Sequence, residues 1–110
     1  MQNIKDCKIK YLHVLNVNEP KFSLRIVEQV KNAKYFNEEE WGYVTRHKKL
    51  YDLLIENGAK NVFLEENSKA IIDDYAPFVE ILFLHAWDID LSILKVKKYK
   101  NVIMKKKCMF

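Results

Sequence analysis

FVEILFLHAWD, residues Phe78–Asp88, is the stretch of sequence that decides the fold. It begins as a hydrophobic run of strand length and then changes abruptly to a histidine, a tryptophan and an aspartate. A strand buried in a parallel sheet is apolar on both faces and becomes polar where it leaves the sheet. In open α/β sheets, ligands bind beside the carboxyl ends of the strands. The stretch therefore predicts a parallel sheet and places a candidate site at its polar end.

The rest of the chain alternates between strand-like and helix-like segments. We expect strands at Lys10–Val17, Glu40–Thr45, Asn61–Leu64, Phe78–Leu84 and Asn101–Met104. We expect helices at Phe22–Ala33, Lys48–Asn57, Lys69–Tyr75 and Leu91–Tyr99. This alternation favours an α/β fold with a Rossmann-like, doubly wound parallel sheet, because right-handed crossovers place helices on both faces. The predicted strand order is 3-2-1-4-5, which puts the first and fourth strands side by side.

Composition limits the chemistry that the chain can carry. At 110 residues it is expected to form a single domain, residues 1–110. It has two glycines and matches none of the phosphate-loop, dinucleotide-binding, nucleophile-elbow or zinc-protease motifs. Cys7 and Cys108 lie near opposite ends, with no CxxC spacing for a zinc or redox site. We therefore expect no metal and no cofactor.

The charge of the chain is mildly basic and uneven. The net charge is +4, lysines crowd the last sixteen residues, and Arg46–Lys49 form a smaller cluster. These residues are either solvated helix faces with a basic tail, or an attraction for an anionic partner such as phosphate or an acidic membrane surface. No aromatic-interleaved basic motif occurs, so no nucleic-acid partner is expected. With neither a signal peptide nor a run of about 20 apolar residues, the expected location is the cytoplasm, either free or peripheral at the inner face of the membrane.

Two histidines are expected to approach the same edge of the sheet. His13 lies within the first strand and His85 ends the fourth, while Asn16, Trp87 and Asp88 would line the same rim. A histidine near a carboxylate can donate or accept a proton or contact a phosphate. A tryptophan can stack on a sugar or a base. The structural alternatives are a core histidine at 13, an ordinary strand end at 85, a core lid at 87 and a helix cap at 88.

Two stretches of the chain resemble segments of a known enzyme family. YLHVLNVNEPKFSLRIVEQV (Tyr11–Val30) resembles the start of the bacterial N-acetylfucosaminyltransferases that act on a lipid-linked acceptor, in which a strand carrying a histidine precedes a polar loop and a helix. FVEILFLHAWDIDLSILKVKKYKNVIM (Phe78–Met104) is similar to the family's later strand that ends in a histidine, followed by a helix and a strand. The resemblance implies a two-domain GT-B glycosyltransferase, whose N-terminal domain holds the acceptor and whose C-terminal domain holds the nucleotide sugar. It also implies that His13 and His85 lie at the cleft and that Trp87 and Asp88 hold the acceptor.

The resemblance ends where the chain reads NVIMKKKCMF, residues Asn101–Phe110. The family has a segment rich in tryptophan and glycine with an acidic residue there. The departure implies an N-terminal portion only, inactive in sugar transfer on its own, with residues 105–110 as a basic tail that is not native. A non-catalytic α/β binding or interaction module is the alternative function.

Overall fold

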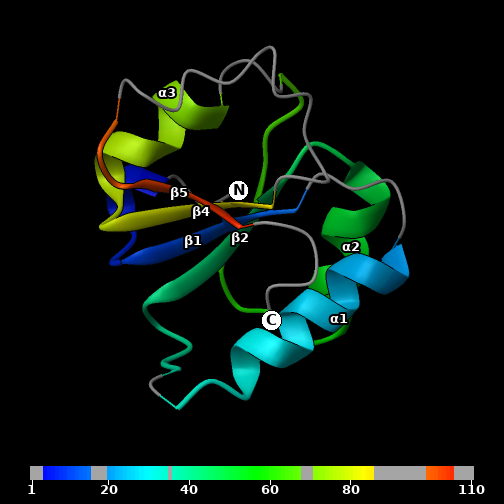
Figure 1. Cartoon of the computed structure of the whole chain (residues 1–110). Helices are drawn as coiled ribbons and strands as arrows, with labels where there is room; N and C mark the ends of the chain where they lie inside the picture. Colours follow the sequence, from blue (N-terminus) through cyan, green and yellow to red (C-terminus); the bar gives the residue numbers. More distant parts are fainter. Residues whose placement is uncertain (1–3, 16–19, 35, 68–70, 86–98, 106–110) are drawn as a thin grey trace.

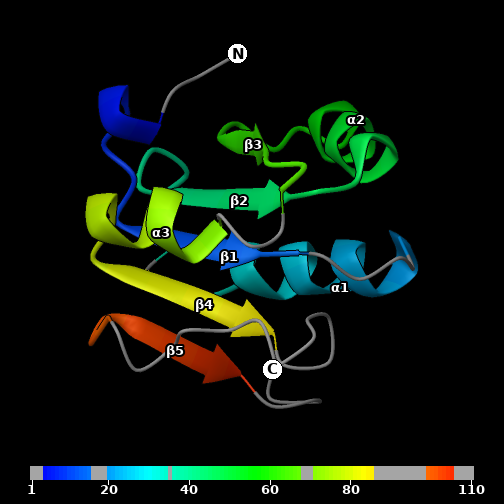
Figure 2. The same ribbon diagram turned by 90° about the horizontal axis from the view of Figure 1, so that it is seen from above.

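Five strands form one parallel sheet in the computed structural model of the chain (Figures 1 and 2). The structure describes residues 4–15, 20–34, 36–67, 71–85 and 99–105. The strands are β1 (Tyr11–Val14), β2 (Trp41–Thr45), β3 (Val62–Leu64), β4 (Ile81–His85) and β5 (Val102–Lys105). Their order is β3-β2-β1-β4-β5, and every neighbouring pair is parallel. The predicted doubly wound Rossmann-like sheet and its strand order are confirmed.

Helices cover both faces of this sheet. α1 (Pro20–Lys31) and α2 (Lys48–Glu56) lie on one face, and α3 (Ile71–Tyr75) lies on the other (Figure 1). The 3-10 helices are η1 (Ile4–Asp6) and η3 (Ala76–Phe78), the second of which directly follows α3. The chain moves outward from β1 to β3 and then crosses back to β4. Because right-handed crossovers made in opposite directions use opposite faces, α3 lies opposite α1 and α2.

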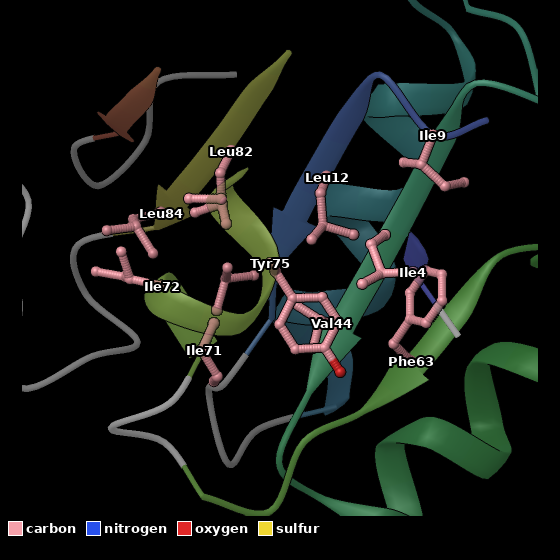
Figure 3. Packing of buried hydrophobic residues seen from close by; sticks show 12 residues of the cluster. Ile4, Ile9, Leu12, Val44, Phe63, Ile71, Ile72, Tyr75, Leu82 and Leu84 are labelled. Carbon is pink, nitrogen blue, oxygen red and sulfur yellow. The ribbon is translucent and has the colours of Figure 1, made fainter. Parts of the chain in front are cut away.

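Side chains alternate between two hydrophobic cores because successive strand residues point to opposite faces. The core beneath α3 joins strand residues to helix residues (Figure 3), and its members include Leu12, Val44, Phe63, Leu82, Leu84, Ile71, Ile72 and Tyr75. The core beneath α1 and α2 contains Leu15, Ile26, Val27, Val30, Tyr43, Leu50, Leu54 and Val62. Both faces of β1 and β2 are therefore buried, as expected of central parallel strands.

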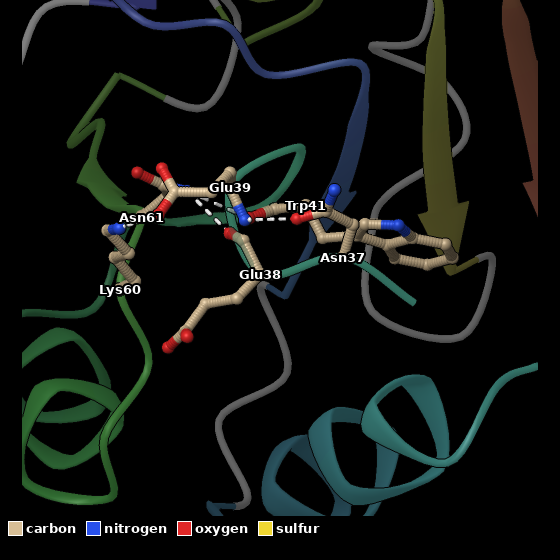
Figure 4. Close-up of polar contacts among 6 residues, drawn as sticks. All are labelled: Asn37, Glu38, Glu39, Trp41, Lys60 and Asn61. Atoms are coloured by element: carbon tan, nitrogen blue, oxygen red, sulfur yellow. Dashed lines mark hydrogen bonds and ion pairs between the residues drawn. The ribbon is translucent and has the colours of Figure 1, made fainter. Parts of the chain in front are cut away.

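The two outer strands begin with the same asparagine arrangement. Asn61 precedes β3, and its Nδ2 donates hydrogen bonds to Glu38 O (3.0 Å) and Trp41 O (3.2 Å), at the entrance to β2 (Figure 4). Its backbone oxygen accepts the Tyr43 N–H at 2.9 Å. Lys60 adds an ion pair to Glu39 beside it. Asn61 is 6% exposed, so this amide joins two strands from inside the protein.

Asn101 repeats the arrangement at the opposite edge of the sheet. It precedes β5, and its Nδ2 donates to Ala76 O (2.8 Å) and Val79 O (2.9 Å), just before β4. Its backbone oxygen accepts the Leu82 N–H at 3.0 Å. The matching segments read KNVFL (residues 60–64) and KNVIM (residues 100–104). Each outer strand is thus attached to its inner neighbour by an asparagine at the same position.

Several element boundaries differ from those that the sequence predicts. β4 begins at Ile81 rather than Phe78, because the chain first completes the 3-10 turn Ala76–Phe78, where Pro77 fits an early helical position. Phe78 is consequently 41% exposed instead of lying in the strand. α1 begins at Pro20, two residues before the predicted start, for the same reason. Most of the predicted helix at residues 91–99 lies outside the described residues.

Candidate functional site

The candidate site is the carboxyl edge of the sheet where β1 and β4 lie side by side. From β1 the chain continues to β2 on one side, and from β4 it continues to β5 on the other side (Figure 2). The two connections therefore leave this edge in opposite directions. In open α/β sheets, such a reversal of strand order leaves a crevice beyond the carboxyl ends of the two strands. The sheet thus supplies the topology that the predicted site requires.

His85 occupies the predicted position in the backbone. It is the last residue of β4, and it pairs in register with Lys105 of β5. Asn16 follows Leu15 in the sequence, while Trp87 and Asp88 come two and three residues after His85. These three predicted site residues lie outside the described residues. The structure therefore brings the strands that carry the site together and places His85 at their carboxyl edge.

His13 lies in the interior of the protein, at a mid-strand position. It is 1% exposed, and its register partners are Tyr43 on β2 and Phe83 on β4. Its ring stacks on that of Phe83, with centroids 4.6 Å apart and planes at 15°, and on that of Trp41, with centroids 5.5 Å apart. Burial and stacking of this kind favour the interpretation of His13 as a core histidine.

Aromatic rings surround His13, and the sequence pattern alone does not identify this cluster. Tyr11 and Phe36 contact Trp41 at centroid distances of 5.0 Å and 5.7 Å. Burial raises the pKa of Tyr43 to about 12, so its phenol stays protonated at neutral pH. Within the described part of the chain, neither Tyr43 OH nor Trp41 Nε1 has a hydrogen-bond partner. The alternation of strand residues was the available signal, because it places residues 11, 13, 41 and 43 on one face once the strands are aligned.

Polar groups also gather at the carboxyl ends of β2 and β3. Thr45 is fully buried, its Oγ1 accepts the His47 N–H at 3.1 Å, and its backbone oxygen accepts the Glu65 N–H at 2.9 Å. Burial is the largest cause that raises the pKa of the Glu65 carboxyl, and a hydrogen bond with Asp74 and its negative charge add to it. The Asn67 N–H, 3.2 Å from Glu65 Oε2, opposes the shift. This side of the edge therefore holds a carboxyl group that takes up a proton more readily than usual.

Tyr75 lies next to these carboxyl groups, at the end of α3. Burial, and after it the charges of Glu65 and Asp74, raise the pKa of Tyr75 to about 12.

Among the residues that the structure describes, no group of three or more His, Cys, Asp or Glu side chains could hold a metal ion. None of the described helices is long and apolar enough to cross a membrane.

Comparison with known proteins found no matching family model, no matching curated protein and no matching solved structure.

Proposed function

We propose that this chain is the acceptor-side domain of a glycosyltransferase and that it binds a lipid-linked sugar diphosphate at the carboxyl edge between β1 and β4. The observation that carries the proposal is the reversal of strand order at these two strands. The ligand class comes from the resemblance of Tyr11–Val30 and Phe78–Met104 to the lipid-linked N-acetylfucosaminyltransferases. The reaction that this resemblance implies is the transfer of an amino-deoxy sugar from a nucleotide sugar to the lipid-linked acceptor.

In this proposal the residues that follow β1 and β4 in the sequence contact the acceptor. His85 contacts the diphosphate, because an imidazole can carry the positive charge or the proton that a phosphate oxygen attracts. Trp87 stacks on the apolar face of the sugar. The Asn16 amide donates hydrogen bonds to the sugar hydroxyl groups or accepts them, and the Asp88 carboxylate accepts them. His13 does not contact the acceptor in this proposal. Its ring packs against Phe83 and so holds β1 against β4.

The proposal assigns the nucleotide sugar to a second domain, as in the two-domain architecture that the resemblance implies. We therefore expect the 110-residue chain to bind the acceptor without transferring a sugar to it. Added nucleotide sugar should leave the affinity for the acceptor unchanged. Sugar transfer by this chain alone would contradict the assignment.

The test is a calorimetric titration with a short-chain, water-soluble polyprenyl-diphosphate sugar. His85→Ala should weaken binding about tenfold, which corresponds to about 1.4 kcal/mol. His47→Ala is the matched control, because His47 also follows a strand at the carboxyl edge but lies beyond β2, away from the β1–β4 boundary. Equal binding by wild type and His85→Ala, or binding by neither, would remove the site from consideration.

A non-catalytic interaction module is the second candidate, and β5 is the observation that favours it. β5 is the last strand in the sheet order of the described residues, and its Ile103 is 41% exposed. An outer strand can accept a further strand from a partner through its backbone groups. Under this function, Ile103→Lys would abolish self-association in size-exclusion chromatography with light scattering, whereas His85→Ala would not. A wild-type chain that elutes as a monomer at every concentration would argue against it.

A further inference from the structure

The outer surfaces of α1 and α2 form a basic face, which we define by the exposed charged residues at 20–34 and 46–58. Seven basic and three acidic side chains are exposed there. The basic residues are Lys21, Arg25, Lys31, Lys34, Arg46, Lys48 and Lys49, and the acidic residues are Glu28, Asp52 and Glu56. The two helices lie next to each other, since Lys31 Nζ donates to Asn57 O at 3.4 Å and both helices contribute to one core.

The described segments around α3, on the opposite side of the sheet, are mainly acidic. In the described residues 4–8, 65–67 and 71–80, six side chains are acidic and two are basic. The acidic residues are Asp6, Glu65, Glu66, Asp73, Asp74 and Glu80, and the basic residues are Lys5 and Lys8. Among these described residues, the basic set lies with α1 and α2 on one face of the sheet, and the acidic set lies around α3 on the other face, the helices being placed as Figure 1 shows. A charge distribution of this kind orients a protein at a charged surface.

An apolar side chain lies among the charges of the basic face. Ile55 on α2 is 48% exposed, and it lines a groove with Leu53, Lys49, Asp52 and Glu56. An exposed apolar residue beside lysines suits the boundary between lipid headgroups and acyl chains. A single-stranded nucleic acid would instead favour aromatic side chains on which bases can stack. Ile55 therefore favours a lipid surface as the anionic partner.

We propose that the basic face of α1 and α2 docks onto an anionic phospholipid surface. Its lysines and arginines contact the headgroups, and Ile55 reaches the acyl boundary. Both helices begin at the end of the sheet toward which the strands point (Figure 2), so the docked face starts at the carboxyl edge. This inference goes beyond acceptor binding, because the lipid surface itself is the partner and no sugar is involved.

The experiment is co-sedimentation with vesicles that contain no lipid-linked sugar. The protein should bind vesicles of phosphatidylcholine mixed with phosphatidylglycerol, leave vesicles of phosphatidylcholine unbound, and dissociate at high salt. Lys21→Glu combined with Lys49→Glu should weaken binding to the anionic vesicles at least tenfold. Ile55→Ser should weaken binding further at low salt, because it removes an apolar contribution to binding.

Lys8→Glu combined with Lys100→Glu is the matched control. Both lysines are exposed and lie outside the basic face, and the double substitution changes the net charge by the same amount. The control variant should bind anionic vesicles within twofold of wild type. Equal loss of binding in both double variants, equal binding to both kinds of vesicle, or tighter binding to duplex DNA than to the anionic vesicles would overturn the proposal. Because these vesicles lack the acceptor, their result is independent of the calorimetric titration.

Discussion

Gly42 lies at a point in β2 where the neighbouring chain leaves little room for a side chain. A Cβ there would be 3.2 Å from Asn61 O and 3.4 Å from Ile9 Cδ1. Gly42→Ala should therefore lower the free energy of unfolding by about 1–3 kcal/mol, as crowding in a packed interior does, measured by urea denaturation. Gly58→Ala is the comparison, because that position is open but has a φ of +86°, which should cost about 1–2 kcal/mol. An unchanged stability in Gly42→Ala would mean that the Asn61 backbone moves aside freely.

His13 should contribute to packing and not to ligand contact. Because its ring is stacked and 1% exposed, His13→Ala should lower the free energy of unfolding by about 2–4 kcal/mol, as loss of a large core side chain does. His13→Phe keeps the ring and should cost under about 1.5 kcal/mol. Acceptor binding by His13→Phe, measured by the same titration as for His85→Ala, should be unchanged. A stable His13→Phe variant that no longer binds the acceptor would place His13 in the site.

At the level of elements, the two edge strands depend on their asparagines. Asn61→Ala and Asn101→Ala each remove two hydrogen bonds to backbone oxygens at the start of the neighbouring strand. Each substitution should lower the free energy of unfolding by about 1–3 kcal/mol, because part-buried backbone oxygens lose their donor. The effects should add in the double variant, since the two sites lie at opposite edges of the sheet. Thermal and urea unfolding of the three variants measure this.

Asn57→Ala is the control for these variants. Asn57 Nδ2 also donates to a backbone oxygen, Leu53 O at 2.7 Å, but Asn57 is exposed at the end of α2. Water replaces that hydrogen bond, so the loss should stay below about 1 kcal/mol. An equal loss in Asn57→Ala and Asn61→Ala would show that burial of the asparagine adds nothing.

The helices and strands are the part of the structure that can be predicted best from the sequence. The run Ile81–Leu84 is apolar on both faces, which identifies a buried parallel strand, and the alternation of segments then decides the strand order. The hydrophobic pattern predicts a start of β4 three residues too early, because it does not separate a strand from the 3-10 turn at Ala76–Phe78. The rings around His13 were missed, since alternation gives the face of a residue but not its neighbours on other strands. Of the candidate site, sequence could predict the edge and His85 as a strand end.

At the scale of the whole molecule, stability should depend on pH through the carboxyl groups that join α3 to the end of β3. Burial, together with Asp74, raises the pKa of Glu65 above its ordinary 4.5, so the folded state binds this proton more tightly than the unfolded state. Its contribution to stability is fully present below about pH 4.5 and is lost as the pH rises through the folded-state pKa. Above that pH, two negative charges face each other across the junction of α3 and β3.

Asp74→Asn should therefore raise the free energy of unfolding at pH 7 relative to wild type. The gain should be under about 1 kcal/mol, because both side chains are partly solvated. It should shrink toward pH 4.5, and urea midpoints at several pH values measure it. Glu66→Gln is the control, since the charge of Glu66 is the smallest of the causes that act on Glu65. A gain in Asp74→Asn that is the same at every pH would exclude proton binding as its cause.

The paired asparagines have a consequence for how the sheet opens. Each outer strand, β3 or β5, is attached to one inner strand, through its ladder and through the hydrogen bonds of its asparagine. We therefore expect either outer strand to detach without disturbing the other. Local opening of this kind proceeds in cooperative units with separate free energies. The strands β2, β1 and β4 would then exchange their amide hydrogens last, as one slow unit, with a faster unit on each side. The carboxyl edge of β1 and β4 would lie inside the part of the protein that opens least often.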